Sequence, residues 1–371
     1  MEKAFPATAP EVSIIVPARN EEVCLGDCLQ SLVTQDGVAF EIIVVDDGST
    51  DRTREIAESF SGVQVISPGP LPAGWTGKNN AVVAGAKEAR GSWLLFTDAD
   101  TVHVAGSLAR ALAEAKEYRA DLLSYSPEQI AVTFWEMATL PVVFAELARE
   151  YPPSKVSDPT LPIAAANGQY MLIRREVYDA VGGHAAIGDS LLEDVALARA
   201  VKSSGHSIRF RYAADAVRAR MYRNLAQLRE GWTKNLALLF KHPTWMAVGY
   251  SVESFILLAV VSGVIQVLLF GLSPIPSQSA LLPHNPIPDR YFPLFQWWMI
   301  GCDIFLLLFL LLRSAGRVIT ARFPLRFTII SMMGPPVFAY LLFRSTIAHS
   351  SGNVHWKGRA YTHRGLLTTD Y

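Results

Sequence analysis

The chain divides into two parts by the pattern of its apolar residues. Up to about Thr244, short apolar runs alternate with segments in which apolar residues recur at helical spacing. Beyond Thr244 the apolar runs are long and are separated by Pro-rich or basic connections. The first pattern predicts an α/β domain with a mostly parallel, Rossmann-like sheet, and the second predicts membrane helices. We therefore expect a soluble α/β domain followed by an α-helical membrane domain.

The first part opens with a strand–helix–strand unit. Apolar runs at 12–16 and 41–45 flank a segment whose apolar residues share one helical face (Leu25, Cys28, Leu29 and Leu32). Such a unit has a right-handed crossover and parallel strands. Further strands are expected at 63–66, 92–96 and 121–125 and before Ile173, with helices over 81–90, 104–118 and 175–181. Open α/β sheets bind ligands at the carboxyl ends of their strands, so polar residues that follow these strands are candidates for a site.

Asp98 and Asp100 follow the apolar run at 92–96 directly. Two carboxylates separated by one residue can share a divalent cation, and Mg²⁺ or Mn²⁺ held by few carboxylates takes its other ligands from water and phosphate oxygens. A solvated turn with two helix-capping acids is the alternative for this pair taken alone. The pair predicts a site for a metal and a diphosphate.

Two further polar segments are expected at the same edge. We expect Ser49 or Thr50 to cap the helix after the second strand, which leaves Asp46 and Asp47 as hydrogen-bond acceptors at the edge. Gly77-Lys78-Asn79 is predicted to open a helix, where backbone N–H groups and one ammonium suit a phosphate. Taken alone, the pair Asp46-Asp47 is more often turn chemistry than a binding site. A flexible loop with a solvated lysine explains Gly77-Lys78-Asn79 equally well when that segment is taken alone.

Four segments together resemble the family 2 inverting glycosyltransferases with a GT-A fold. They are Val16-Pro17-Ala18-Arg19-Asn20-Glu21, Val45-Asp46-Asp47-Gly48-Ser49-Thr50-Asp51, Gly77-Lys78-Asn79-Asn80-Ala81 and Thr97-Asp98-Ala99-Asp100, in the order and spacing of that family. The resemblance covers roughly Val12 to Asn235. It implies a nucleotide-diphosphate-sugar donor, UDP-linked by preference, and Mg²⁺ or Mn²⁺ on Asp98 and Asp100. The donor residues it implies are Pro17, Arg19, Glu21, Asp46, Asp47, Lys78, Asn79 and Asp98.

The resemblance also assigns a sugar-binding loop and a base. In the resembled family the loop at Asn167, Gly168 and Gln169 lies under the sugar. An acceptor hydroxyl must lose its proton as it attacks the anomeric carbon, and an ionised carboxylate can take that proton. Asp194 matches the family's base position, with Glu193 as the neighbour that tunes or orients it. Charge complementarity at a helix N-terminus is the alternative explanation of this acid pair.

Residues 218–235 bear on the class of acceptor. Cellulose and hyaluronan synthases, which are processive, carry Gln-x-x-Arg-Trp here, whereas this chain has Gln227-Leu228-Arg229-Glu230-Gly231-Trp232. The segment is more similar to membrane-anchored enzymes that glycosylate single lipids, namely hopanoid- and carotenoid-associated glycosyltransferases and, more distantly, ceramide glucosyltransferases. That resemblance assigns Trp232 to the donor site. The tail segment Trp356-Lys357-Gly358-Arg359-Ala360-Tyr361 also occurs in these enzymes and could return to the donor phosphates. The basic residues of 218–235 precede the first apolar run, and contact with lipid headgroups explains them equally well (Arg220, Arg223 and Lys234).

The second part contains two apolar runs long enough to span a bilayer, 247–272 and 292–312. Asp303 lies near the centre of the second run, where an acid is costly unless it faces protein or water, so it is a candidate for lining an acceptor path. The segment 130–147 is too short and too interrupted to span, and we expect an interfacial or core-facing helix there.

The charges of the connections predict the orientation. Segment 273–291 has one basic residue, and the next connection carries four (Arg313, Arg317, Arg322 and Arg326). The positive-inside rule therefore places the latter, and with it the first domain, in the cytosol. A third apolar block, 327–343, is interrupted by Gly334-Pro335-Pro336, and we expect it to be re-entrant, which keeps the basic tail inside.

Composition excludes some classes of protein. A net charge of −1 and a hydrophobic fraction of 50% do not suit a nucleic-acid surface. The cysteines Cys24, Cys28 and Cys302 form no disulfide or metal framework, which predicts a reduced environment. Residues 1–11 lack the basic and apolar regions of a cleaved signal peptide. We expect an integral protein of a bacterial-type inner membrane with its catalytic domain in the cytosol.

The combined expectation is a membrane-bound inverting glycosyltransferase that transfers a single sugar to a lipid acceptor. Its GT-A domain would span 1–244, its membrane or re-entrant helices 245–345, and its tail 346–371. A processive polysaccharide synthase is the first alternative, and the altered 227–232 segment and the small number of spans disfavour it. A non-catalytic nucleotide-sugar-binding or scaffold subunit is the second, and the intact acids of the four segments argue against it.

Overall fold

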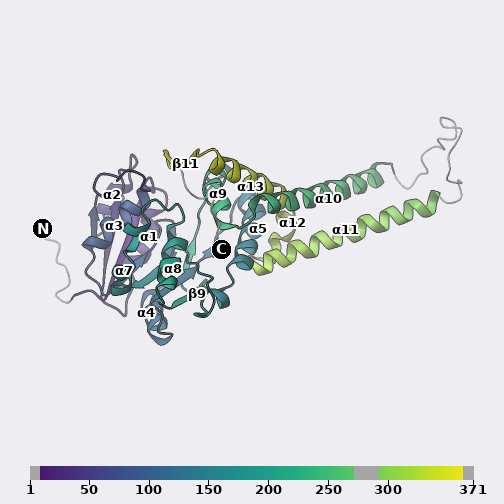
Figure 1. The fold of residues 1–371 in the computed structure, drawn as a ribbon. Helices are drawn as coiled ribbons and strands as arrows, with labels where there is room; N and C mark the ends of the chain where they lie inside the picture. Colours follow the sequence, from purple (N-terminus) through teal and green to yellow (C-terminus); the bar gives the residue numbers. More distant parts are fainter. Residues whose placement is uncertain (1–8, 271–291, 362–371) are drawn as a thin grey trace. The chain divides into compact units, whose positions relative to one another are not determined.

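The computed structural model describes residues 9–270 and 292–361, which form two compact units. The sheet unit takes residues 9–133, 147–241 and 345–361 of this range, and the helical unit takes 134–146, 242–270 and 292–344. Figure 1 labels their elements along the chain. The segment 273–291, on which part of the predicted orientation rests, lies outside the described residues.

The sheet unit is built on a seven-stranded sheet with strand order β3-β2-β1-β4-β8-β6-β9. The strands are β1 Val12–Ala18, β2 Phe40–Asp46, β3 Val63–Ile66, β4 Trp93–Phe96, β6 Leu122–Ser126, β8 Met171–Arg174 and β9 Ile208–Tyr212. β1 pairs in parallel with β2 and β4, β2 with β3, and β6 with β9, while β8 runs antiparallel to β4 and β6. The prediction of a mostly parallel α/β sheet is confirmed.

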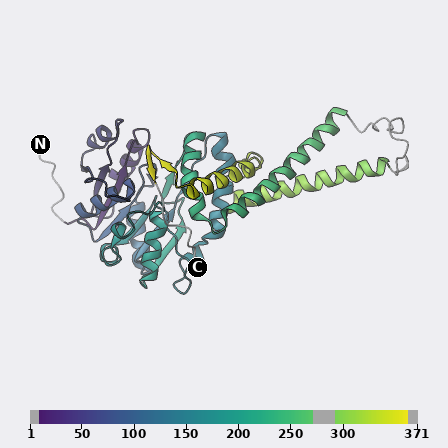
Figure 2. The same cartoon turned by 45° about the horizontal axis from the view of Figure 1, so that its top comes forward.

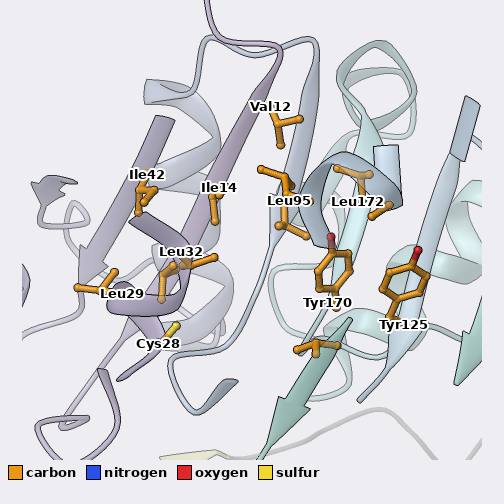
Figure 3. Close-up of a cluster of buried hydrophobic side chains, with 14 of the residues drawn as sticks. Val12, Ile14, Cys28, Leu29, Leu32, Ile42, Leu95, Tyr125, Tyr170 and Leu172 are labelled. Atoms are coloured by element: carbon orange, nitrogen blue, oxygen red, sulfur yellow. The ribbon is translucent and has the colours of Figure 1, made fainter. Parts of the chain in front are cut away.

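Helices cover both faces of this sheet. Successive residues of a strand point to opposite faces, and Ile14 therefore packs with α1 (Leu25–Val33) and α4 (Ser107–Glu117). Ile15 packs on the other face with α3 (Gly77–Glu88) and α8 (Glu193–Ser203). Figure 3 shows the first of these two cores, with the α1 side chains against the strands. Because both faces are buried, the strands read as continuous apolar runs.

The remaining helices of the unit are short or lie later in the chain. They are α2 Thr53–Glu58, α6 Pro153–Val156, α7 Arg175–Ala180, η1 Gly183–Ile187 and α9 Leu225–Leu239. The prediction that Ser49 or Thr50 caps α2 was wrong, because the Ser49 hydroxyl accepts the backbone N–H of Asn20 and Thr50 lies too far upstream. Asp51 instead accepts the backbone N–H of Thr53 at 3.0 Å.

Two small sheets complete the unit. One has the order β5-β10-β7, from Thr101–His103, Val217–Ala219 and Glu128–Gln129. It pairs the chain just after Asp100 with the chain that leads to α9. The other is a hairpin of β11 (Val354–Trp356) and β12 (Arg359–Tyr361). Strands of two or three residues carry too little apolar pattern to be predicted.

The helical unit contains two long apolar helices, α10 (Pro243–Phe270) and α11 (Phe292–Thr320). Residues 243–267 and 297–320 are long and apolar enough to cross a membrane. The pair 325–331 and 334–350 passes the same test together but is bent by 65°. It consists of η4 Leu325–Phe327, α12 Thr328–Ser331 and α13 Gly334–Ser350, and the first part of α5 (Phe134–Glu150) completes the unit.

Charged residues join α10 to α11. Glu253 accepts hydrogen bonds from both Nη atoms of Arg317 at 2.6 Å each and lies 3.1 Å from Nε of Arg313. The two arginines therefore lie on α11 and not in a connection, because α11 continues past its predicted end. Further along, the Asp303 carboxylate lies directly against the backbone of Gly263, where a methyl group would clash.

The outward faces of these helices are strongly apolar. Phe255 is 70% exposed and Leu312 is 72% exposed, and many neighbouring large apolar side chains are exposed as well. Proteins that are monomeric in water rarely expose contiguous apolar surface on this scale. The helical unit therefore exposes the kind of apolar surface that a membrane or another protein covers.

Candidate active site

Lys78 joins two acids from separate elements at the carboxyl edge of the sheet. Its Nζ lies 2.6 Å from Oδ1 of Asp98, which follows β4, and 2.6 Å from Oε1 of Glu193, which begins α8. The first turn of α3 presents this lysine, and the Thr76 hydroxyl caps the helix by accepting the backbone N–H of Asn79 at 3.1 Å. One ammonium therefore connects three elements.

The charges of this group follow from its surroundings. Burial acts to lower the pKa of Lys78, but Asp98 and Glu193 outweigh it and raise that pKa well above its ordinary value. Burial acts to raise the pKa of Glu193, but Lys78 and then Lys234 hold it at about 2. At neutral pH the lysine is a cation and Glu193 is an anion, so the cluster can orient a charged substrate.

Asp194 stands beside this group with a different electrostatic character. Burial, and then the neighbouring Glu193, raise the pKa of Asp194 to about 6. Its Oδ2 accepts the backbone N–H of Gly168 at 3.0 Å, and a methyl group at Gly168 would stand 3.2 Å from both Glu193 Oε1 and Lys78 Nζ. Glycine therefore lets the loop approach the acid pair closely. A carboxylate poised near neutral pH suits a general base.

The second acid of the 98–100 pair lies within electrostatic reach of the first. Burial, and then the charges of Asp98 and Glu21, raise the pKa of Asp100 to about 7. Such a concentration of carboxylates is stabilised by a bound divalent cation, and two carboxylates suit Mg²⁺ or Mn²⁺ that takes its other ligands from water and phosphate. Nowhere in 9–270 or 292–361 do three or more His, Cys, Asp or Glu side chains form a ready metal cage. A metal here would depend on Asp98, Asp100 and the substrate.

The loop at 167–169 lies next to these acids. Gln169 Nε2 is 3.5 Å from Oδ1 of Asp100, and its backbone N–H donates to Oδ1 of Asn167 at 3.0 Å. The backbone N–H of Asn167 in turn donates to the Ser124 hydroxyl at 2.8 Å, which fixes the loop on β6. The structure therefore brings Lys78, Asp98, Asp100, Gly168, Gln169, Glu193 and Asp194 into one group.

The acids after β1 and β2 lie at the same sheet edge. Pro17 pairs in register with Val45, and Nη1 of Arg19 donates to the backbone carbonyl of Asp47 at 2.7 Å. Asp46 accepts the backbone N–H of Ser49 at 3.2 Å, so this acid stabilises its own turn. The carboxylates of Glu21 and Asp47 are instead bound by two cations, Lys357 and Arg359.

Two predicted donor residues have supporting positions. The side-chain amide of Asn79 donates to the backbone carbonyls of Ile187, Gly188 and Ser190 at 3.0 Å each, which ties α3 to the loop before α8. Trp232 is 2% exposed and packs edge-on against Tyr222, with ring centroids 5.8 Å apart. Both side chains hold the elements that carry the charged residues.

Sequence reasoning missed a buried polar group beneath the 98–100 turn. The Thr97 hydroxyl donates to the Gln169 carbonyl at 2.8 Å and lies 3.1 Å from Nε2 of His103. Burial lowers the pKa of His103 to about 3, so the ring is neutral. Since β5 is only three residues long, no apolar pattern marked His103 as buried.

Lys234 was grouped with possible headgroup contacts, and the structure gives it another position. Its ammonium lies 5.1 Å from the centroid of the Trp356 ring. Burial lowers its pKa, while the charge of Glu193 acts to raise it. Lys234 is therefore part of the electrostatic environment of the acid pair.

Comparisons with known proteins agree with this geometry. Residues 13–182 match Glycosyl transferase family 2. The chain is 30% identical over 234 residues to the 4,4'-diaponeurosporenoate glycosyltransferase of Staphylococcus aureus (strain USA300), a match that covers 61% of this chain and 60% of that protein. The chain thus spans less than two thirds of this curated relative.

One of two similar solved structures shows a related fold. The mannosyltransferase PcManGT from Pyrobaculum calidifontis, in complex with GDP-Man and Mn²⁺, superposes with a TM-score of 0.50 at 15% identity, over 92% of this chain and 87% of that one. The glucosyl-3-phosphoglycerate synthase from Mycobacterium tuberculosis, in complex with Mn²⁺, UDP and glucosyl-3-phosphoglycerate, gives a TM-score of 0.40 at 21% identity, over 62% of this chain and 79% of that one. The first likeness confirms the predicted GT-A fold.

Proposed function

We propose that this protein is a membrane-bound inverting glycosyltransferase that makes a glycolipid, as the match of residues 13–182 to Glycosyl transferase family 2 supports. It transfers one sugar from a nucleoside-diphosphate sugar, with a UDP-sugar favoured, to a lipid acceptor. The observation that carries the proposal is the chain of ion pairs Asp98–Lys78–Glu193 with Asp194 beside it. This arrangement places a mobile cation and a separate, less acidic carboxyl in one site.

Different residues of the donor site suit different parts of the nucleotide sugar. Lys78 and the N-terminus of α3 suit the diphosphate, because an ammonium and free backbone N–H groups both stabilise anions. Asp98 and Asp100 would hold Mg²⁺ or Mn²⁺, which neutralises charge on the diphosphate leaving group. Glu21 and Asp47 offer acceptors for the hydroxyl and N–H groups of the nucleoside. Gly168 and Gln169 contact the sugar.

The transfer itself is a single displacement. The acceptor oxygen forms a bond to the anomeric carbon as the bond from that carbon to the diphosphate oxygen breaks, which inverts the configuration. A hydroxyl acceptor gives its proton to Asp194, and Glu193 keeps Lys78 charged through the step. An acceptor that is already a carboxylate, as in the named relative's carotenoid acid, attacks without that proton transfer.

The helical unit supports a lipid acceptor. Its exposed apolar side chains and its two helices of membrane-spanning length suit insertion into a bilayer. A lipid does not leave the membrane cheaply, since each CH₂ group exposed to water costs about 0.8 kcal/mol. We place the protein in a bacterial-type inner membrane with the sheet unit in the cytosol, and we keep 327–343 as a re-entrant segment.

The test uses the full-length protein in lipid nanodiscs. It would be incubated with labelled UDP-glucose, UDP-galactose, UDP-N-acetylglucosamine or GDP-mannose, together with total bacterial membrane lipid and Mg²⁺ or Mn²⁺. Mass spectrometry should find a lipid heavier by one sugar, absent with Asp194→Asn if the acceptor is a hydroxyl. A series of products that differ by one sugar would support the processive polysaccharide synthase. If no donor sugar is consumed, the result would support the non-catalytic nucleotide-sugar-binding or scaffold subunit.

A further inference from the structure

The hairpin of β11 and β12 lies against the N-terminal strands of the sheet unit, although almost the whole chain separates them in sequence. Figure 2 shows the hairpin in yellow beside the purple strands. The hairpin is fixed on α9, because the backbone N–H of Lys357 donates to Oε1 of Glu230 at 2.9 Å and the Trp356 ring lies over Lys234. The tail is therefore a defined part of the sheet unit.

Two cations of this hairpin bind two acids assigned to the nucleoside. The Lys357 ammonium donates to the Glu21 carboxylate and to the Arg19 carbonyl, the latter at 3.0 Å. The Arg359 guanidinium donates to both carboxylate oxygens of Asp47, one of them at 3.0 Å through Nη2. Acceptors that a nucleoside would use are thus occupied by the protein's own cations.

Arg359 also occupies the place that suits a phosphate. Its Nη1 lies so close to Gly77 that any side chain there would overlap it. Gly77 is the first residue of α3, and helix N-termini carry partial positive charge that favours anions and disfavours cations. Nε of Arg19, nearby, is buried and has no hydrogen-bond partner among the described residues. Arg19, Arg359 and the first residue of α3 therefore all lie close to the carboxylate of Asp47.

We propose that Lys357 and Arg359 are donor-binding residues that exchange their acidic partners for the diphosphate of the nucleotide sugar. This inference rests on the proposed function and extends it. A guanidinium matches a phosphate through two parallel hydrogen bonds, and an ammonium adds a second charge. When the two cations turn to the diphosphate, Glu21 and Asp47 become free for the nucleoside, and the hairpin forms one wall of the filled site.

This exchange of partners distinguishes a hairpin that binds the donor from a hairpin that only blocks the donor site. A hairpin that only blocks the site competes with the donor, so removal of its cationic side chains would tighten nucleotide binding. A donor-binding hairpin contributes charge-assisted hydrogen bonds to the diphosphate, so its removal weakens that binding. The nucleoside without phosphates gains nothing from the cations, so their removal should not weaken its binding.

The experiment measures the binding of UDP and of uridine to the full-length protein by calorimetry, with Mg²⁺ present. Arg359→Ala and Lys357→Ala should each weaken UDP binding by about ten-fold or more, the loss expected for a charge-assisted hydrogen bond. Uridine binding should not weaken, because each variant frees one of the two acids, Glu21 or Asp47, that accept hydrogen bonds from the nucleoside. Arg359→Lys keeps the positive charge but loses the paired N–H donors of the guanidinium. Its affinity for UDP should therefore lie between those of wild type and Arg359→Ala.

His355→Ala is the matched control, because His355 lies on the same hairpin with its side chain exposed, and this variant should bind UDP as wild type does. UDP binding that is unchanged or tighter in both alanine variants overturns the proposal while leaving the proposed function intact. A wild-type protein that binds none of UDP, GDP and ADP overturns both.

A second measurement needs no substitution. Hydrogen exchange of the wild-type backbone amides at 354–361 should slow when UDP is added, and uridine should give no such protection. Exchange that is insensitive to UDP, in a protein that binds UDP, contradicts the role of the hairpin.

Discussion

The two units each hold a basic residue between acids, half-buried Lys78 in one and buried Arg317 in the other, and the two clusters differ in geometry. In the sheet unit, the single ammonium of Lys78 touches Asp98 and Glu193 on separate elements. In the helical unit, the planar guanidinium of Arg317 pairs both Nη atoms with both oxygens of Glu253. A point charge on a flexible stem can accept a new anionic partner, whereas a bidentate fork fixes one geometry. The comparison separates a site that receives a ligand from a contact that joins two helices.

The strongest test of this comparison removes the metal acids. Asp98→Ala and Asp100→Ala should each reduce sugar transfer below detection, because the diphosphate loses its divalent cation. Transfer by the wild type should also stop in EDTA and return with Mg²⁺ or Mn²⁺. The control is Asp179→Ala, an exposed acid on α7, which should transfer at the wild-type rate. Full wild-type activity in EDTA would remove the metal from the mechanism.

The next test separates base from binding. With a hydroxyl acceptor, Asp194→Asn should lower kcat by about 10²- to 10⁴-fold, because the amide keeps the shape of the side chain but does not take a proton. The Kd for the donor should stay close to that of wild type, since Lys78 and Glu193 are unchanged. Steady-state kinetics and calorimetry on the same preparation measure both quantities. Unchanged turnover would assign the base to another residue.

The corresponding test in the helical unit predicts a loss of stability. Arg317 is 1% exposed, and Arg317→Met leaves Glu253 with Arg313 alone. Removing one partner of a buried ion pair costs about 3 to 5 kcal/mol, and we expect the lower end because Arg313 remains. Thermal unfolding in detergent should show a lower Tm, and Arg317→Met with Glu253→Gln should recover part of it. If the single variant melts like wild type, the cluster does not join the helices.

The smallest expected effect is a pH dependence of turnover. Asp194 faces Glu193, Lys78 and Lys234, and burial together with Glu193 raises its pKa to about 6. A base works when it is deprotonated, so with a hydroxyl acceptor kcat should be constant above about pH 7 and fall about ten-fold per pH unit below about pH 6. Glu193, with a pKa of about 2, stays ionised throughout this range. A profile that is flat through pH 6 would contradict the assignment of Asp194.

The local pattern of apolar residues was enough to predict most strands and helices of the sheet unit. The strands β1, β2 and β3 and the helix α1 were predicted because each is marked by its own apolar residues and needs no distant contact to be recognised. The direction of β8 was not predicted, since Met171–Arg174 reads the same whether the strand is parallel or antiparallel. Hydrophobic pattern predicts that a strand is buried and says little about its direction.

The candidate site was predictable as a set of residues more than as a set of contacts. Acids that follow strands were correctly expected at the sheet edge, because strand ends determine their position. Asp46 was expected to accept hydrogen bonds at this edge, and one of its oxygens accepts the backbone N–H of Ser49 in its own turn. The pairs Lys78–Glu193 and Arg359–Asp47 join residues far apart in the chain. Only the three-dimensional fold brings these partners together.

The elevated pKa of Asp194 has a consequence for folding. A carboxyl group whose pKa is about 6 in the folded chain and 3.8 as its ordinary value favours folding while it is protonated, and that advantage disappears as the pH rises through this interval. At neutral pH the folded chain is therefore less stable, by roughly 3 kcal/mol, than it would be with an unperturbed carboxyl. Asp194→Asn should melt at a higher temperature than wild type. The residue that we propose as the base thus also makes the folded chain easier to unfold at neutral pH.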